Sequence, residues 1–194
     1  MADKPRLITK EDYDKFYANG GFGYDKSTTE KFMADVVKLP DLAFSSNEKL
    51  TLLDVGCGDG FLSDIFSKWF NVVGIDNSTV GIRIAKNKYP NIKFIESDVL
   101  SHNEKYDIVY NRACQISNCP TSSVNFIEST KHLVSLAKKH YFFSEWTRED
   151  FYNTYDGRWH YKNPLEVLTE CLKHGKASMI YDKLICNFVV RIDF

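Results

Sequence analysis

The sequence has no long apolar run, no paired cysteine motif and no excess of charge of either sign. Its 194 residues include 25 Lys or Arg and 26 Asp or Glu, which gives the chain no electrostatic attraction to nucleic acid or anionic membranes. No stretch approaches the roughly 18 apolar residues of a membrane helix, and residues 1–10 lack the apolar centre of a signal peptide. We therefore expect no DNA partner, no membrane association and a cytoplasmic location.

The five cysteines are odd in number, irregularly spaced and without a Cys-x-x-Cys pair. This pattern predicts neither a disulfide framework nor a zinc site, so we expect reduced thiols and no bound metal. Aromatic residues make up 14% of the chain, which favours a well-filled core and an aromatic-lined pocket. The balance of 43% hydrophobic and 26% charged residues is typical of a single soluble domain, here residues 1–194.

From residue 50 onward, short apolar runs alternate with longer amphipathic ones, a pattern typical of a parallel sheet covered by helices on both faces. The last two apolar runs are joined by a link too short for a crossover helix, so they must pair as an antiparallel hairpin. The predicted strands are residues 50–55, 71–76, 92–96, 106–110, 141–143, 177–181 and 185–192. The predicted helices are residues 61–70, a short helix that contains residues 80–85 and is ended by Pro90, and residues 123–139 and 164–175. The lysines at 86, 88, 138 and 139 are expected on solvated helix faces.

The first 45 residues are predicted to form a helical lid on a core that spans residues 48–194. One helix is expected over residues 10–18, stopped by Asn19 and the glycines that follow. A second is expected over residues 28–38, opened by the capping box at residues 27–30. The glycine-rich joint between them, residues 20–23, has the composition of a hinge.

The first strand runs directly into Gly56-Cys57-Gly58-Asp59-Gly60 and then into a helix, an arrangement typical of a nucleotide site. The third glycine comes one residue too early for a dinucleotide loop, which weakens a pyrophosphate interpretation. Asp76 ends the second strand, where a carboxylate can accept both ribose hydroxyls, and Asp98 follows the third. Because these elements share the carboxyl edge of the sheet, we expect an open ligand site there, with no side chain of the protein over the loop.

At these residues the chain resembles the class I S-adenosylmethionine-dependent methyltransferases. The resemblance covers residues 48–194 and is carried by LLDVGCGDGFLS, VVGIDNS, IKFIESDVL, YDIVYNRA and the terminal hairpin, in order and at the family's spacing. It implies an α/β fold with a Rossmann-like, doubly wound seven-stranded sheet, mostly parallel with a C-terminal antiparallel hairpin. It also implies S-adenosyl-L-methionine as the cofactor, with S-adenosyl-L-homocysteine as its product.

The resemblance also assigns cofactor-binding roles. The glycine loop with Asp54 would flank the methionine part of the cofactor, and Asp76 would hold the ribose. Asn77, Asp98 and Val99 would contact the adenine. Asn111 would line the floor near the sulfonium. The full cofactor set is Asp54, Gly56, Cys57, Gly58, Gly60, Asp76, Asn77, Asp98, Val99 and Asn111.

The acceptor side is less defined. Residues 146–162 form a long loop dense in aromatic and polar groups, which we expect to roof the acceptor pocket, with His160 as the best general base by its ordinary pKa and Glu145 as a second candidate. The alternative is that His160 and Trp159 only pack this loop onto the domain. The expected pocket residues are Tyr13, Tyr17, Cys114, Trp146, Trp159 and Tyr161.

Cys114-Gln115 invites comparison with the Pro-Cys-Gln nucleophile of the cytosine-C5 methyltransferases. Ala113 replaces the proline, and the chain has no room for a target-recognition domain, so Cys114 is better interpreted as a small, mostly buried residue.

We therefore expect a methyltransferase that acts on a small molecule, with an oxygen, nitrogen or sulfur acceptor. The alternatives are a noncatalytic cofactor-binding subunit, an RNA or protein methyltransferase and, disfavoured by the glycine spacing, a nucleotide-dependent dehydrogenase. The sequence does not fix the oligomeric state.

Overall fold

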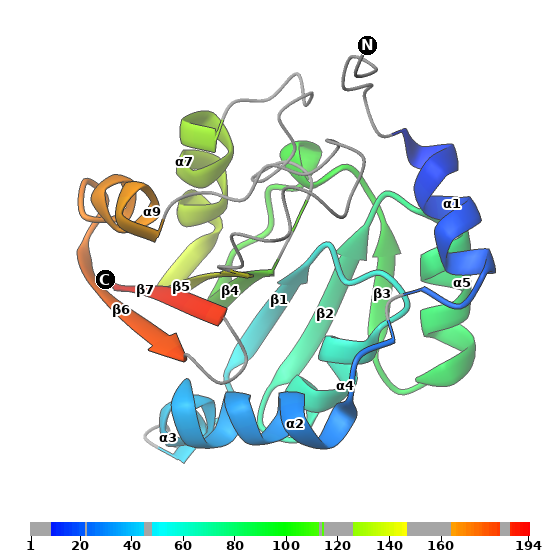
Figure 1. The fold of residues 1–194 in the computed structure, drawn as a ribbon, viewed down its shortest axis with the longest axis horizontal. Coiled ribbons are helices and arrows are strands. Elements are labelled where there is room, and N and C mark those ends of the chain that lie inside the picture. The colour runs from blue at the N-terminus through cyan, green and yellow to red at the C-terminus, as the bar shows by residue number, and fades with distance from the viewer. Residues whose placement is uncertain are drawn as a thin grey trace, which may run out of the picture.

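A seven-stranded sheet forms the centre of the computed structural model, which describes residues 9–21, 23–44, 48–112, 114, 126–146, 164–182 and 187–194. The strand order is β3-β2-β1-β4-β5-β7-β6. Strands β1 to β5 are parallel, whereas β7 pairs antiparallel with both β5 and β6 (Figure 1). This confirms the predicted mostly parallel sheet with a terminal hairpin. The strands are β1 (Thr51–Val55), β2 (Asn71–Asp76), β3 (Lys93–Glu96), β4 (Tyr106–Arg112), β5 (Ala137–Trp146), β6 (Lys176–Asp182) and β7 (Asn187–Asp193).

Helices cover both faces of this sheet, as the alternation of patterns predicts (Figure 1). One face carries α2 (Lys26–Lys31), the π-helix η1 (Phe32–Val36), α3 (Leu39–Phe44), α4 (Phe61–Ser67) and α5 (Thr79–Lys88). The other carries α7 (Phe126–Leu136) and α9 (Pro164–Cys171), while α1 (Lys10–Ala18) packs against α5 and the short 3-10 helix η2 (Val99–Ser101) follows β3. No helix in these described ranges is long and apolar enough to cross a membrane.

The boundary between α7 and β5 differs from the prediction. The helix ends at Leu136 and the strand begins at Ala137, so Lys138 and Lys139 lie in β5 and not on a solvated helix face. Lys139 forms an ion pair with Asp107 at 3.6 Å, and its carbonyl accepts the N–H of Phe194 at 3.0 Å. Pairing with β4 and β7 therefore overrides the helical pattern of these residues.

The N-terminal segment also differs in detail. The capping box predicted at residues 27–30 does not open the second helix: α2 begins at Lys26, and the Asp25 carboxylate caps it by accepting the N–H of Thr28 at 2.7 Å. A capping box is present instead at α1, between Thr9 and Asp12. After α2 the chain continues as the π-helix η1 and then α3, which the periodicity does not predict.

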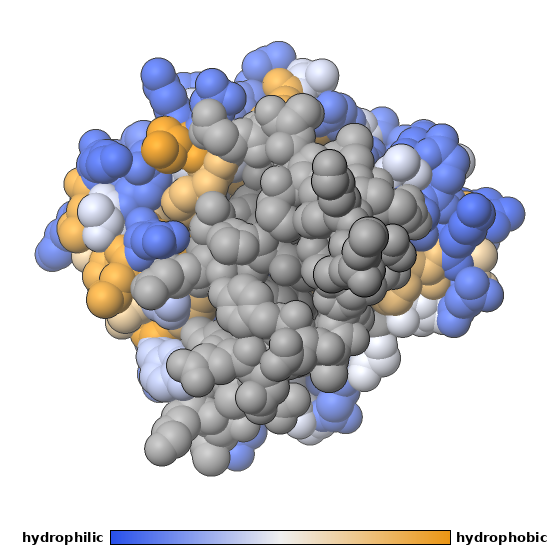
Figure 2. Space-filling model, turned by 45° about the horizontal axis from the view of Figure 1, so that its top comes forward, coloured by the Kyte–Doolittle hydropathy of each residue, from blue (hydrophilic) through white to orange (hydrophobic). Residues whose placement is uncertain are grey.

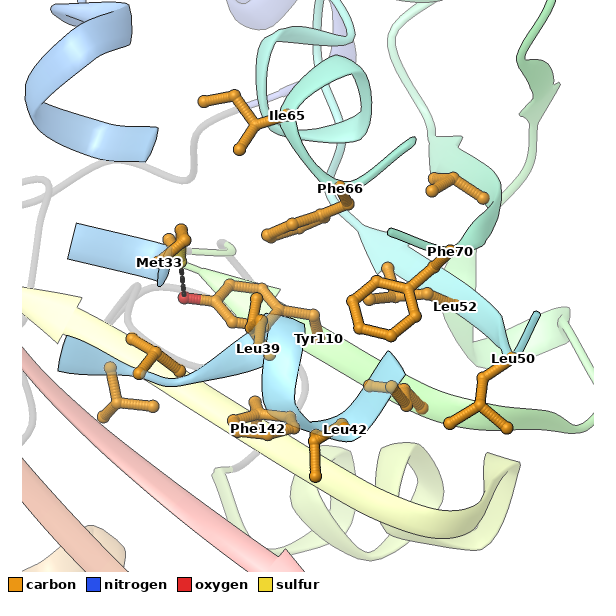
Figure 3. Packing of buried hydrophobic residues seen from close by; sticks show 14 of the residues in the cluster. Met33, Leu39, Leu42, Leu50, Leu52, Ile65, Phe66, Phe70, Tyr110 and Phe142 are labelled. Carbon is orange, nitrogen blue, oxygen red and sulfur yellow. Dashed lines mark hydrogen bonds between the residues drawn. The ribbon is translucent and has the colours of Figure 1, made fainter. Parts of the chain in front are cut away.

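One hydrophobic core lies between the sheet and the helices η1, α3 and α4 (Figure 3). Tyr110 is at its centre: its ring lies 4.8 Å from that of Phe66 and 5.8 Å from that of Phe142, and its hydroxyl donates to the Met33 sulfur at 3.4 Å. Met33 is fully buried in this cluster. The N-terminal segment is thus attached to the sheet through buried packing, which fixes where α1 approaches the carboxyl edge.

Candidate functional site

A cavity of about 110 Å³ lies at the carboxyl ends of the parallel strands. Its floor is the glycine loop, residues 56–59, and the ends of β2 and β4. Its cover comes from the N-terminal segment. The cavity brings together ten of the residues expected from the sequence: Tyr13, Tyr17, Gly56, Cys57, Gly58, Asp76, Asn77, Asp98, Val99 and Cys114. The predicted convergence of these elements on one edge is therefore present in the structure.

The glycine loop is held in a conformation that suits glycine. Gly58 has a φ of +54°, in the left-handed region where a side chain is strained. The loop is tied to β2, because the N–H groups of Gly56 and Cys57 both donate to the carbonyl of Ile75, at 2.9 and 3.0 Å. The loop backbone is thus fixed at the floor of the cavity before any ligand binds.

Asp76 connects the glycine loop to the second strand. Its carboxylate accepts the N–H of Gly58 at 2.9 Å and the N–H of Ser78 at 2.8 Å. Burial raises the pKa of this carboxyl above its usual value, and the two backbone donors act in the opposite direction. The side chain is held at the end of β2, where the sequence expects a ribose partner.

Tyr17 lies over this loop, and in this respect the expectation of an uncovered site is wrong. The Tyr17 side chain is only 7% exposed, and its hydroxyl lies 2.2 Å from the position that a Cβ on Gly58 would occupy. Ligand sites for molecules of nucleoside size usually enclose at least about 300 Å³. A ligand of that size therefore requires the Tyr17 ring to move from the space above Gly58.

The helix that carries Tyr17 is docked on α5. The Asp14 carboxylate accepts the hydroxyl of Ser78 at 2.6 Å and the N–H of Val80 at 2.9 Å, so it satisfies the first turn of α5. Lys10 adds an exposed ion pair with Glu96 at 2.5 Å. Asp14 is therefore the main polar contact between α1 and the sheet edge.

Replacing Asp14 with Ala should lower the free energy of unfolding by about 0.5–2 kcal/mol, because α5 loses a capping acceptor. Amide hydrogen exchange in α1 should accelerate, while exchange in α7 stays unchanged. Lys15→Ala, at an exposed residue of the same helix, is the control and should leave both readouts near those of the wild type. Equal protection of α1 in the two variants would contradict a docking role for Asp14.

Asp54 is directly behind the cavity and does not line it. The side chain is 1% exposed and accepts the hydroxyl of Ser63 in α4 at 2.6 Å. Burial raises the pKa of Asp54 to about 7, opposed by the Ser63 hydrogen bond and by the positive charge of Arg112. The predicted contact with the methionine part of a cofactor is therefore not direct in this conformation, and the visible role of Asp54 is to join β1 to α4.

The raised pKa of Asp54 predicts a pH effect on stability. Between about pH 4 and 7 the folded protein keeps a proton that the unfolded chain, with an ordinary pKa of 3.8, releases. The free energy of unfolding should therefore fall as the pH rises through this window, by at most about 1.4 kcal/mol per pH unit. Asp54→Asn should remove this fall, so its stability relative to the wild type increases from pH 4 to 7. If urea unfolding gives the wild type and Asp54→Asn the same dependence of the unfolding free energy on pH, the raised pKa of Asp54 is contradicted.

Among the described residues, Gly60, Asn111 and Glu145 do not line the cavity. Gly60 is the N-cap of α4 at a φ of +84°, and a side chain there would meet Phe94, so its role is in folding. Asn111 and Glu145 are each 1% exposed at the ends of β4 and β5. Trp146 is the last residue of β5, whereas Trp159, His160 and Tyr161 lie outside the described residues, so the proposed base stays a prediction.

Sequence reasoning missed several lining residues, including Asp59, Phe61 and Leu62 at the start of α4. It also gave no role to Tyr24 or Arg112, although Arg112 stands inside the quoted motif YDIVYNRA. The available signal was strand alternation, which places Arg112 on the same face as Tyr110 at the carboxyl end of β4.

A second hollow lies between α7 and α9 and contains none of the predicted site residues. It is lined by Phe126, Ile127, Leu165 and neighbouring polar residues of the two helices. Figure 2 shows hydrophobic residues gathered on this side of the molecule. Within the described ranges, no three His, Cys, Asp or Glu side chains are grouped so that they could hold a metal ion. The carboxyl-edge cavity is therefore the candidate site.

Comparisons with known proteins indicate a family for part of this chain. A family model described as a methyltransferase domain matches residues 52–141. The putative methyltransferase 235L of Invertebrate iridescent virus 6 is 34% identical over 96 residues, which cover 47% of this chain and 36% of the relative. Malonyl-[acyl-carrier protein] O-methyltransferase 1 of Ilyobacter polytropus is 32% identical over 116 residues, covering 55% and 42%. The chain thus spans less than half the length of these two curated relatives.

Solved structures match over nearly the whole chain at low identity. The magnesium protoporphyrin IX methyltransferase from Synechocystis PCC 6803, solved with bound S-adenosylmethionine, aligns with a TM-score of 0.62 at 16% identity, over 98% of this chain and 99% of that one. The PH0226 protein from Pyrococcus horikoshii OT3 aligns with a TM-score of 0.69 at 16% identity, over 96% and 99%. Residues 52–141 therefore belong to the methyltransferase domain family, and the chain has the Rossmann-like fold of the class I S-adenosylmethionine-dependent methyltransferases that its motifs resemble.

Proposed function

We propose that the chain binds S-adenosylmethionine at the carboxyl-edge cavity and transfers its methyl group to a small-molecule acceptor. The observation that carries the proposal is the convergence on one cavity of Gly58, which carries no side chain of its own, and the Asp76 carboxylate. A nucleoside with a ribose diol needs a close backbone approach and an acceptor carboxylate in this arrangement. The names of the relatives support the same chemistry, since the two curated relatives described above are named as methyltransferases.

The residues present fit this cofactor. In the proposal Asp76 accepts the ribose hydroxyls, Asn77, Asp98 and Val99 contact the adenine, and residues 56–58 approach the methionine part. When bound, the cofactor supplies an activated methyl group on a sulfonium. The chain itself has to orient an acceptor and exclude water, and Tyr13, Tyr17 and Tyr24 cover the cavity in a way that suits exclusion of water.

Proton removal from the acceptor is a separate proposal. His160 remains the preferred base on its ordinary pKa, and Glu145 is the alternative at the end of β5. The burial of Glu145 means that it would act only from inside the protein, on an acceptor that reaches the floor of the cavity.

The test is binding of S-adenosylhomocysteine by calorimetry, followed by a metabolite library in which its release from S-adenosylmethionine is measured. We expect one-to-one binding and release with a defined set of small molecules. Binding without turnover until a partner chain is added would instead indicate a noncatalytic subunit. Activity on RNA with strong salt dependence, or on a protein, would move the acceptor to a macromolecule. Absence of binding would contradict the proposal.

A further inference from the structure

Arg112 is the basic residue that the described part of the chain places in the cavity lining. It is the last residue of β4, two positions after the buried Tyr110, so it lies on the same face of the sheet. Its guanidinium carbon lies 5.2 Å from the centre of the Tyr24 ring, and that ring lies 5.5 Å from the ring of Phe61. An aromatic wall from the N-terminal segment and α4 thus holds the plane of the guanidinium beside the cavity.

The charges along the cavity are separated. The acids Asp76 and Asp98 lie at the ends of β2 and β3, where Asp76 accepts two backbone N–H groups and Asp98 accepts the N–H of Leu100 at 2.9 Å. Asp59 is paired with Lys88 at 2.7 Å. Arg112 lies at the end of β4, on the other side of β1 from β2. One end of the cavity is therefore acidic and the other carries a permanent positive charge.

The guanidinium of Arg112 is partly buried in the protein. The Nε and Nη1 atoms of Arg112 are buried, and a guanidinium stays protonated at all physiological pH values. The positive charge of Arg112 lowers the pKa of the nearby Asp54 carboxyl, which burial raises to about 7. An arginine has five N–H donors in a planar fork, a geometry that matches the two oxygens of a carboxylate.

We propose that Arg112 binds a carboxylate inside the cavity. A carboxylate is the planar anion that the guanidinium fork contacts through two parallel hydrogen bonds, and the Tyr24 ring fixes the plane in which they form. Under the proposed function this carboxylate has two sources: the amino-acid end of the cofactor, or the acceptor. The inference rests on that function and adds a residue that determines which ligands the site prefers.

The cofactor source is tested with two ligands that share the adenosine and sulfur. S-adenosylhomocysteine carries the amino-acid carboxylate, whereas 5′-methylthioadenosine lacks it. If Arg112 binds this carboxylate, Arg112→Gln should weaken S-adenosylhomocysteine binding roughly 10-fold to 100-fold while methylthioadenosine binding changes less than about twofold. Arg112→Lys keeps the positive charge but not the planar fork of donors, so its affinity for S-adenosylhomocysteine should lie between those of the wild type and Arg112→Gln. Arg83→Gln, at an exposed arginine of α5, is the matched control and should change neither affinity.

The acceptor source is tested on the complex with S-adenosylhomocysteine, using thermal shift with pairs of carboxylic acids and their primary amides. If the acceptor carries the carboxylate, at least one acid should stabilise the wild-type complex more than its amide does. Arg112→Gln should abolish this difference without weakening the binding of S-adenosylhomocysteine. The inference is overturned if Arg112→Gln leaves the ratio of the two cofactor analogues unchanged and the wild type prefers no acid.

A purely structural role for Arg112 has its own signature. If the residue served only to neutralise Asp54, Arg112→Gln would lower stability, and adding Asp54→Asn would restore both stability and ligand affinity; restoration of affinity would overturn the inference. Failure of the wild type itself to bind S-adenosylhomocysteine would instead remove the proposed function, so the two failures are distinguishable.

Discussion

Replacing Asp76 with Ala should weaken S-adenosylhomocysteine binding by about 30-fold to 150-fold, corresponding to the loss of a charged hydrogen-bond pair worth about 2–3 kcal/mol. The carboxylate is held at the end of β2 by the N–H groups of Gly58 and Ser78, so its position in the cavity lining is fixed before a ligand binds. Calorimetric titration of the variant measures the loss directly.

The loss of those two backbone contacts also destabilises the fold, and a matched control separates the two effects. Asp107 accepts the N–H and the hydroxyl of Thr51, at 3.0 and 2.8 Å, at the start of β4 and so at the opposite edge of the sheet. Asp107→Ala should therefore lower the melting temperature to a similar extent without changing the affinity. Equal affinities for the Asp76 variant and the wild type would refute the assignment of Asp76 to the ribose.

Replacing Gly58 with Ala should reduce cofactor affinity by about 10-fold to 100-fold and also destabilise the chain. The added methyl group projects into the cavity at a backbone φ of +54°, which costs about 1–2 kcal/mol for a residue with a side chain. It would also lie 2.2 Å from the Tyr17 hydroxyl, so the ring must move. Urea unfolding and calorimetry on the same preparation measure both losses.

The structure provides two controls for this variant. Gly23→Ala adds the same methyl group where no heavy atom lies within 4 Å and should change neither stability nor affinity. Removing the Tyr17 ring as well, in Gly58→Ala with Tyr17→Ala, should recover part of the stability because the close contact disappears. It should not recover affinity, because the methyl group still occupies the ligand's approach. Strictly additive stability losses would show that Tyr17 does not lie over the loop in solution.

The features that were predicted correctly are those with a local cause. The glycine loop between β1 and α4 is visible because a strand pattern, closely spaced glycines and a helical pattern follow each other without a gap. The terminal hairpin follows from a link too short for a crossover. Asp76 and Asp98 share an edge because the carboxyl ends of parallel strands do.

What the sequence did not reveal depends on contacts between distant segments. The position of Tyr17 over Gly58 requires the docking of α1 on α5 through Asp14, and no spacing in the sequence specifies that pair. The start of β5 at Ala137 follows from its pairing with Tyr106 of β4, which overrides a continuous helical pattern. Strand alternation predicts which face of the sheet Arg112 occupies, but not its contact with Tyr24, which lies 88 residues earlier in the chain.

The most direct test is calorimetric titration of the purified chain with S-adenosylhomocysteine, with NAD titrated in parallel. We predict saturable binding of one S-adenosylhomocysteine per chain and no competition from NAD. A flat titration with the sulfur compound, or a preference for the dinucleotide, would contradict the assignment of the carboxyl-edge cavity to an adenosine with a sulfur-linked amino acid.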